Sequence, residues 1–137
     1  MKLIIIGGGF GGLKLARKLS NKPGFDITLI DKFNYHQFQP LFYQVATAGL
    51  SAPSIAAPIR HMLRKQRNAT VLMAEVAAID KAARTVSLAD GQQIGYDALI
   101  VASGATHSYF GHDDWAAHAP GLKTLAAALK LPAQLPS

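Results

Sequence analysis

The stretch KLIIIGGGFGGLKLARKL, residues Lys2–Leu19, holds five glycines among the six positions Gly7–Gly12. A run of aliphatic residues typical of a buried strand comes before them, and apolar residues with helical spacing follow. Glycine loses more backbone freedom on folding than any other residue, so such a cluster is unfavourable unless something requires the absent side chains. We expect that requirement to be a phosphate group held against the backbone.

The spacing of three of these glycines is that of a dinucleotide-binding turn. Gly7, Gly9 and Gly12 fit G-x-G-x-x-G, in which a tight turn, close approach of a diphosphate and close helix packing each need a glycine. A second apolar run, Phe25–Asp31, ends in a carboxylate that can accept hydrogen bonds from ribose hydroxyls. Together these segments predict a right-handed βαβ unit. The alternative is a glycine-rich turn beside an aspartate that only caps a loop.

Composition excludes several other classes of protein. The 137 residues include no cysteine, which rules out disulfides and thiolate metal sites, and half of them are apolar, as in a globular domain. Fourteen basic and eight acidic residues give a formal charge of +6, which favours anionic ligands, acidic lipid or nucleic acid. No stretch approaches the ~18 apolar residues of a membrane-spanning helix, and the short apolar start is no signal peptide.

The remaining pattern predicts an α/β fold, with a parallel sheet and a small antiparallel β excursion. The aromatic-rich segment Asn34–Gly49 has no clear period and is predicted to be a long loop. The last strand should return to the buried parallel sheet, while the two strands before it should form the antiparallel excursion. The predicted helices are Gly11–Ser20, Ser54–Lys65 and Lys123–Leu131, and the predicted later strands are Ala69–Asp80, Arg84–Asp90 and Tyr96–Ala105.

Three separated stretches resemble the N-terminal region of type II NADH dehydrogenases, the single-subunit flavin enzymes that pass electrons from NADH to quinone. They are IIIGGGFGGL (Ile4–Leu13), DKFNYHQFQPLFYQVATAGLSAPSIAAPIR (Asp31–Arg60) and YDALIVASGATHSYFGHDDWAAHAPGLKTL (Tyr96–Leu125). They occur in the family's order and cover nearly the whole chain. The resemblance implies a Rossmann-like FAD/NAD(P)-binding domain over residues 1–137, in which the glycine turn holds FAD rather than NAD.

The resemblance also implies a role for individual residues. Asp31 would hold the adenosine ribose, Lys32 would lie beside the adenine, and Val76 would contact the adenine through its backbone. His36 would lie near the phosphates, although a loop histidine bonded to backbone is the alternative. Ser103 stands where threonine is common in the family, and the hydroxyl is kept. The implied cofactor-binding residues are Gly7, Gly8, Gly9, Phe10, Gly11, Gly12, Asp31, Lys32, His36, Thr47, Val76, Ala102, Ser103 and Gly104.

A bound flavin supplies the redox chemistry itself, so we assign no catalytic side chain. A metal site is the other candidate considered. His107, His112 and His118, with Asp113 and Asp114, lie close together in the sequence, but their spacing matches no metal-binding pattern. We therefore expect a polar surface loop there and assign no metal.

The family's enzymes are considerably longer than this chain, so we expect an N-terminal portion that lacks the NADH-binding domain and the C-terminal membrane-anchoring region. Such a portion should have no NADH:quinone turnover by itself and should hold FAD weakly. For the intact enzyme the resemblance implies NADH and quinone as partners, no nucleic acid, and a cytoplasmic location, peripheral to the inner face of the cell membrane. A homodimer is a further hypothesis.

Three other interpretations stay open. A sulfide:quinone or ferredoxin-type reductase would share the architecture, and redox cysteines elsewhere would indicate the sulfide enzyme. A stand-alone module that senses NAD or FAD and regulates a partner would bind the dinucleotide without chemistry. Nucleic-acid binding driven by the charge of +6 ranks last, because the basic cluster near Arg60–Arg67 lacks interleaved aromatic residues.

Overall fold

The computed structural model describes residues 1–119 and 121–130. The chain forms two compact units, which are described separately. The first unit consists of Met1–His36 and Pro58–Gly104, and the second consists of Gln37–Ala57 and the described residues from Ala105 onward.

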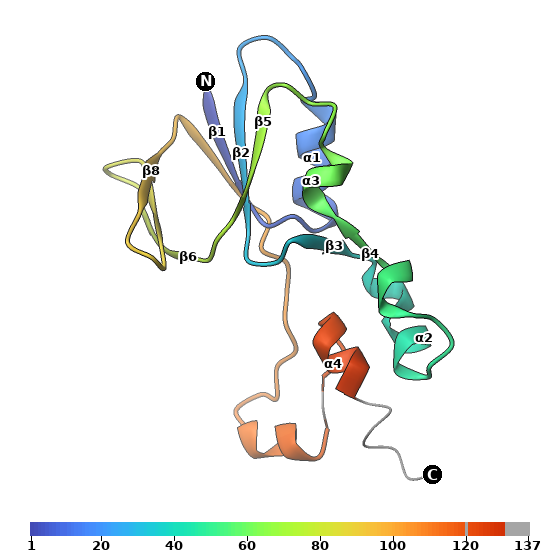
Figure 1. Cartoon of the computed structure of the whole chain (residues 1–137). Coiled ribbons are helices and arrows are strands. Elements are labelled where there is room, and N and C mark those ends of the chain that lie inside the picture. The colour runs from blue at the N-terminus through green and yellow to red at the C-terminus, as the bar shows by residue number, and fades with distance from the viewer. Residues whose placement is uncertain (120, 131–137) are drawn as a thin grey trace. The chain divides into compact units, whose positions relative to one another are not determined.

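The first unit is built on a four-stranded parallel sheet in the order β5-β2-β1-β9 (Figure 1). All three neighbouring pairs run parallel, with Leu3 of β1 opposite Ile27 of β2 and Ala98 of β9. The predicted βαβ unit and the predicted return of the last strand to the parallel sheet are therefore confirmed. The strands are β1 (Lys2–Ile6), β2 (Asp26–Asp31), β5 (Ala69–Met73) and β9 (Ala98–Val101).

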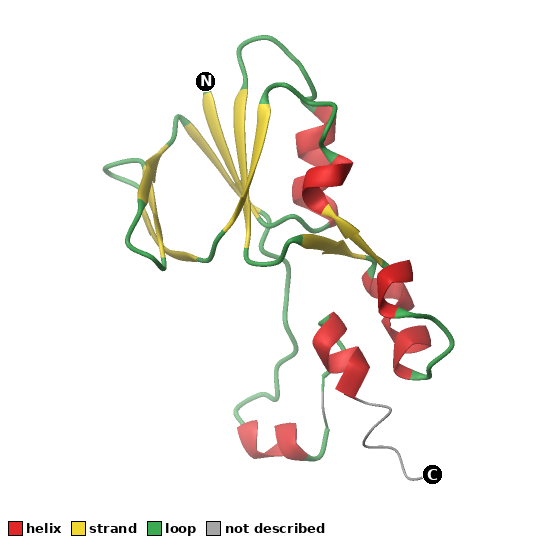
Figure 2. Cartoon of the chain, in the orientation of Figure 1, coloured by secondary structure: helices red, strands yellow, loops and turns green. Residues whose placement is uncertain are grey.

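Two helices, α1 (Phe10–Lys18) and α3 (Ile59–Met62), cover one face of this sheet (Figure 2). Side chains alternate between the two faces of a strand, so this face receives every second residue of β1 and β2. Leu13 and Ala16 of α1 are buried, and Leu15 and Leu19 are partly buried against the same core. The buried residues of this layer are Leu3, Ile5, Leu13, Ala16, Ile27, Leu29, Ile59 and Leu63.

A three-stranded antiparallel sheet covers the opposite face. It consists of β6 (Val76–Asp80), β7 (Thr85–Leu88) and β8 (Gln93–Gly95). Val86 and Leu88 are buried against Ile4 and Ile30 of the parallel sheet. The antiparallel excursion predicted from the sequence is thus confirmed.

The second unit contains short helices. The helix α4 (Leu125–Lys130) packs against α2 (Phe42–Ala46), and Phe42 and Val45 of α2 and Leu125 and Ala128 of α4 are buried. The chain passes from one unit to the other within β3 (Tyr35–Gln37) and β4 (Ala56–Pro58), which pair as a two-stranded sheet. Among the described residues no helix is both long and apolar enough to span a bilayer. The helices are η1 (Gln39–Leu41), α2 (Phe42–Ala46), η2 (Ala52–Ser54), η3 (Asp113–Ala117) and α4 (Leu125–Lys130).

The predicted helix Ser54–Lys65 is wrong over its first half. The 3-10 helix η2 ends at Ser54, the next residues enter β4, and α3 begins only at Ile59. Pro58 explains the delay, because a proline disfavours the helical conformation of the residue before it. The predicted helix Lys123–Leu131 is α4, which begins at Leu125; Leu131 lies outside the described residues.

Three strand and loop predictions are also corrected. The single predicted strand Ala69–Asp80 is two strands, β5 in the parallel sheet and β6 in the antiparallel one, because the chain changes partner at Ala74 and Glu75. The predicted loop Asn34–Gly49 contains β3, η1 and α2, which are too short to show a period. The last strand is less buried than predicted: Val101 is 60% exposed, because β9 is an edge strand of the parallel sheet.

Candidate dinucleotide site

The sheet topology gives the first indication of a site. From β1 the chain adds β2 and then β5 on one side, whereas β9 pairs with the other side of β1. The strand order therefore reverses beside β1. In open α/β sheets, ligands bind outside the carboxyl ends of the strands at such a reversal. The glycine turn follows the carboxyl end of β1 directly, so it lies at this position.

Two of the glycines serve the packing of the turn. Gly7 has φ +102°, and a Cβ at this position would collide with the backbone carbonyl of Ala102, which follows β9. The Gly7 N–H also donates to the Ile30 carbonyl at 2.8 Å. A Cβ on Gly12 would collide with the Gly7 carbonyl. The turn is therefore pressed against both neighbouring strands and against its own helix.

Gly9 differs from these two glycines. Among the described residues, and apart from its two chain neighbours, no protein atom lies within 4 Å of the position that its Cβ would occupy, and Gly9, Phe10 and Gly11 are exposed. Gly9 is the N-cap of α1, and it makes no side-chain cap hydrogen bond. The first N–H groups of a helix have no intrahelical partner, and they carry the positive end of its dipole. This open, side-chain-free backbone fits a diphosphate.

Asp31 lies at the carboxyl end of β2, beside the turn. Its Oδ2 accepts the Gly8 N–H at 2.6 Å, and its Oδ1 accepts the Phe33 N–H at 2.7 Å. The carboxylate therefore ties the glycine turn to β2 and also caps the following loop, as the alternative interpretation proposed. A carboxylate has about four acceptor sites. Two lone pairs are left with which it can accept ribose hydroxyls.

His36 is buried beneath the turn. Its Nδ1 lies 3.0 Å from the Gly8 carbonyl oxygen, and because a carbonyl only accepts, Nδ1 is the protonated nitrogen. The Phe10 ring meets the imidazole edge-on, with the ring centroids 5.0 Å apart. A bond to backbone was the alternative interpretation of His36, and it is present. The backbone concerned is that of the glycine turn, so His36 also holds the candidate site together.

Other candidate residues gather at the same edge of the sheet. The Ala102 N–H donates to the Ile6 carbonyl at 2.7 Å, and Gly104 has φ +76°. Val76 begins β6, two residues after Ala74, whose N–H donates to the Asp31 carbonyl at 3.0 Å. The first unit thus brings Gly7–Gly12, Asp31, His36, Val76 and Ala102–Gly104 to the carboxyl ends of the parallel strands.

Lys32 and Thr47 are engaged elsewhere. The Lys32 ammonium lies 5.3 Å from the centre of the Phe33 ring. Thr47 belongs to the second unit, where its hydroxyl donates to the Tyr43 carbonyl at 3.0 Å, at the end of α2. A role in cofactor binding stays a prediction for both residues.

Sequence reasoning missed one supporting contact. The side chain of Ile59, at the start of α3, lies where a Cβ on Gly8 would stand. Gly8 is therefore a third closely packed glycine, but a Cβ there would meet only the end of a flexible side chain and no backbone atom, unlike one at Gly7 or Gly12. The contact joins residues 51 positions apart, and no local pattern signals it.

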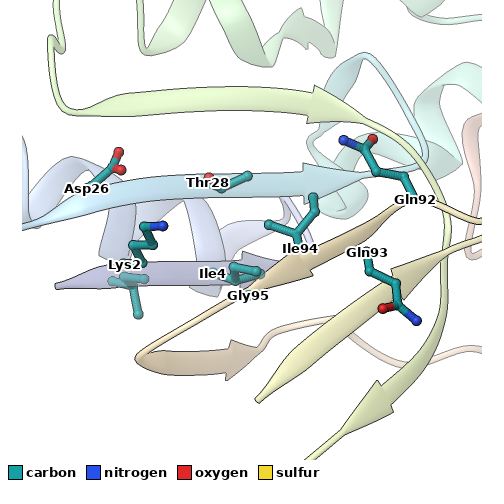
Figure 3. Close-up of a pocket in the computed structure, with 9 residues that line it drawn as sticks. Lys2, Ile4, Asp26, Thr28, Gln92, Gln93, Ile94 and Gly95 are labelled. Carbon is teal, nitrogen blue, oxygen red and sulfur yellow. The ribbon is translucent and has the colours of Figure 1, made fainter. Parts of the chain in front are cut away.

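A separate cavity lies at the opposite end of the strands (Figure 3). Its volume is about 350 Å³, and the residues around it come from the amino ends of β1 and β2 and from the β7–β8 hairpin. Lys2, Asp26, Thr28, Gln92 and Gln93 contribute polar side chains. This cavity does not coincide with the glycine turn, which follows the carboxyl end of β1.

The histidines and aspartates near residue 112 do not form a metal site. The His112 ring stacks on Trp115, with the ring centroids 4.4 Å apart. Throughout residues 1–119 and 121–130, no group of three or more histidine, cysteine, aspartate or glutamate side chains could hold a metal ion.

Comparison with known proteins decides the family. The model of the pyridine nucleotide-disulphide oxidoreductase family matches residues 1–135. The chain belongs to this family. Among pyridine nucleotide-disulphide oxidoreductases it is 52% identical to the type II NADH:quinone oxidoreductase NdhA of Mycobacterium tuberculosis over 133 residues, which are 95% of this chain and 28% of that protein. The chain thus spans little more than a quarter of the length of that relative.

Two solved structures resemble the fold closely. The sulfide:quinone oxidoreductase of Aquifex aeolicus matches with a TM-score of 0.87 and 30% identity, over 97% of this chain and 31% of that one. NDH2 of Plasmodium falciparum, solved in complex with NADH, matches with a TM-score of 0.84 and 26% identity, over 96% of this chain and 28% of that one. The Rossmann-like FAD/NAD(P)-binding fold predicted from the sequence is confirmed.

Proposed function

We propose that this chain forms the FAD-binding part of an oxidoreductase that passes electrons from NADH to quinone. The observation that carries the proposal is the open backbone at Gly9, placed at the reversal of strand order beside the Asp31 carboxylate. The 52% identity to a type II NADH:quinone oxidoreductase supports FAD as the dinucleotide and supports NADH and quinone as the donor and acceptor.

Each part of the turn has a separate task in this proposal. The N–H groups at the start of α1 hold the diphosphate, and Asp31 accepts the hydroxyls of the adenosine ribose. His36 and Asp31 both bond to Gly8, from its carbonyl side and its N–H side respectively, so they fix the turn before a ligand arrives. FAD, when bound, supplies the hydride and electron chemistry, while the protein binds and orients it.

We also propose a location for the intact enzyme. We expect it to associate peripherally with the inner face of the cell membrane, from the cytoplasmic side, because respiratory quinones are lipid-soluble. Residues 1–137 are proposed to act as one FAD-binding domain. A homodimer is a further prediction, as is the absence of a nucleic-acid partner.

A ligand comparison tests the proposal. The chain is titrated calorimetrically with FAD, NADH, NADPH and AMP under the same conditions. We expect FAD to bind at least about tenfold more tightly than either nicotinamide dinucleotide, a difference of ~1.4 kcal/mol. A preference for NADH or NADPH would contradict the proposal and would favour a sensor module or an ordinary dehydrogenase.

The second candidate is a sulfide:quinone reductase. The structural match to the Aquifex aeolicus enzyme favours it, and this candidate shares FAD and quinone with the first proposal but differs in the electron donor. The complete enzyme, assayed with a soluble quinone and either NADH or sulfide, distinguishes the two. We expect reduction of quinone with NADH; reduction with sulfide alone would establish the second candidate.

A further inference from the structure

The positive charge of the chain is concentrated in its first 74 residues. Ten of the fourteen lysines and arginines lie there, but only two of the eight acidic residues, Asp26 and Asp31. No acidic residue occurs between Lys32 and Ala74, or before Asp26. The two helices that cover the parallel sheet therefore carry cations with no carboxylate among them.

Two asparagines bring many of these cations together at one end of the helix layer. The Asn68 carboxamide accepts the Asn21 N–H at 2.9 Å and donates to the Leu19 carbonyl at 3.0 Å. The Asn21 carboxamide accepts the Arg67 N–H at 2.7 Å and donates to the Lys65 carbonyl at 3.3 Å. These bonds fasten the loop after α1 to the loop after α3.

Six exposed cations lie within four residues of Asn21 or Asn68, and we name them the basic surface. All six belong to the first unit, and both helices pack on the same face of the parallel sheet. The basic surface consists of Arg17, Lys18, Lys22, Arg64, Lys65 and Arg67.

The basic surface is separate from the candidate dinucleotide site. The glycine turn lies at the start of α1 and the basic surface at its end, and a nine-residue helix spans ~13 Å. Cations near a helix C-terminus complement the helix dipole, which accounts for Arg17 and Lys18 at the end of α1. The helix dipole does not account for Lys22 and Arg67, which lie in the loops, or for the lack of acidic residues near the six cations in the sequence.

We propose that the basic surface docks the protein on an anionic lipid bilayer. A cluster of four to eight lysines and arginines is the size that binds acidic headgroups, and each cation adds to the attraction near the surface. A bilayer presents a broad charged plane and requires no groove. The choice of a bilayer rests on the proposed function, because a quinone reductase acts at a lipid phase.

Nucleic acid is the less favoured partner. Proteins that bind single strands combine cations with aromatic side chains on which bases stack. None of the exposed large hydrophobic side chains lies in residues 17–22 or 64–68, which form the basic surface and its two asparagines. The surface thus offers charge without stacking platforms.

Vesicle sedimentation tests the proposal with the 137-residue chain. Phosphatidylcholine vesicles with and without phosphatidylglycerol are compared at low salt and at about 0.5 M salt, where screening is strong. The test variant carries Lys18→Gln, Lys22→Gln, Arg64→Gln and Arg67→Gln. The control variant loses the same charge elsewhere through Lys81→Gln, Arg84→Gln, Lys123→Gln and Lys130→Gln. Circular dichroism confirms that both variants are folded.

We expect binding only to the anionic vesicles, its loss in high salt, and a fall of more than about tenfold in the test variant with less than about threefold in the control. No binding at low salt, or an equal loss in both variants, would overturn the proposal. Tighter binding to duplex DNA than to anionic vesicles at equal salt would assign the surface to nucleic acid instead. FAD titration of both variants separates this result from the proposed function, because neither variant alters the glycine turn.

Discussion

Gly9 and Gly12 are three residues apart, yet they lack a side chain for different reasons. A Cβ on Gly12 would collide with the Gly7 carbonyl, so this glycine is needed by the protein itself. A Cβ on Gly9 would meet no atom of the described residues within 4 Å beyond its two chain neighbours, and the backbone there has φ −72°, which any residue can adopt. The space beside Gly9 is therefore available to a ligand.

The two positions should respond oppositely to substitution. Gly9→Val should weaken FAD binding by more than about tenfold, while the free energy of unfolding changes by less than about 0.5 kcal/mol. Gly12→Ala should lower the free energy of unfolding by about 1–3 kcal/mol, because overpacking displaces the helix from the turn. Urea denaturation and FAD titration measure both quantities. Equal FAD affinity of the wild type and the Gly9→Val variant would show that no diphosphate lies there.

Residue spacing predicted part of this site. The turn follows β1 and Asp31 ends β2, as G-x-G-x-x-G and the acidic end of the second apolar run predict, while their role in cofactor binding stays a prediction. The spacing could not reveal that Asp31 and His36 both bond to Gly8, since those bonds join loops whose geometry depends on the folded sheet. Packing of Ile59 against Gly8 was equally hidden, because the two residues come from different helices and turns.

At the scale of elements, the helix layer is held by polar contacts as well as by its core. Asn21 adopts φ +54°, a left-handed conformation that asparagine tolerates better than most residues. Its hydrogen bonds with Asn68, Lys65 and Arg67 connect the loop after α1 to the loop after α3, two segments that are far apart in the sequence. Removing these hydrogen bonds should lower the free energy of unfolding, because they hold together the ends of α1 and α3, which also carry the basic surface.

The variant Asn68→Ala tests that link. It removes the acceptor of the Asn21 N–H and the donor to the Leu19 carbonyl, so the free energy of unfolding should fall by about 1–2 kcal/mol. Gln92→Ala in the exposed β7–β8 hairpin is the matched control, and we expect almost no change there. Denaturation midpoints of the two variants that coincide would contradict a structural role for Asn68.

Helices and strands were predicted well where the apolar spacing continues over many residues, and poorly where the chain leaves one sheet for another. The helix after the glycine turn was predicted within two residues at its end, because its apolar spacing continues over several positions. The segment from residue 69 to 80 has the pattern of one strand, yet it forms one strand in each of two sheets. The alternation of side chains along a strand carries no information on which sheet the strand joins. The helix predicted from Ser54 fails because Pro58 disfavours the helical conformation of the residue before it, and α3 begins only at Ile59.

At the scale of the whole molecule, strand order is the decisive feature. The order β5-β2-β1-β9 places the glycine turn at the reversal beside β1. Local pattern could predict the βαβ unit, but it could not predict that β5 would join β2, because that pairing depends on contacts about forty residues apart. Resemblance to a family indicated the Rossmann-like fold as a whole, but it did not predict this pairing. The division into two compact units had no signal in composition.

The glycine turn and the cavity described above lie at opposite ends of the parallel strands of the first unit. The glycine turn follows the carboxyl end of β1, whereas the cavity of about 350 Å³ lies at the amino ends of β1 and β2. A site-resolved measurement therefore distinguishes them without any variant.

Titration of the isotope-labelled chain with FAD, followed through its backbone amide resonances, tests the central claim most directly. Binding at the glycine turn predicts that the largest shifts fall on the amides of Gly8, Gly9, Phe10 and Gly11, with little change in residues 92–95. Largest shifts at Gln92–Gly95, with the amides of the glycine turn unmoved, would contradict the claim that this turn holds the diphosphate.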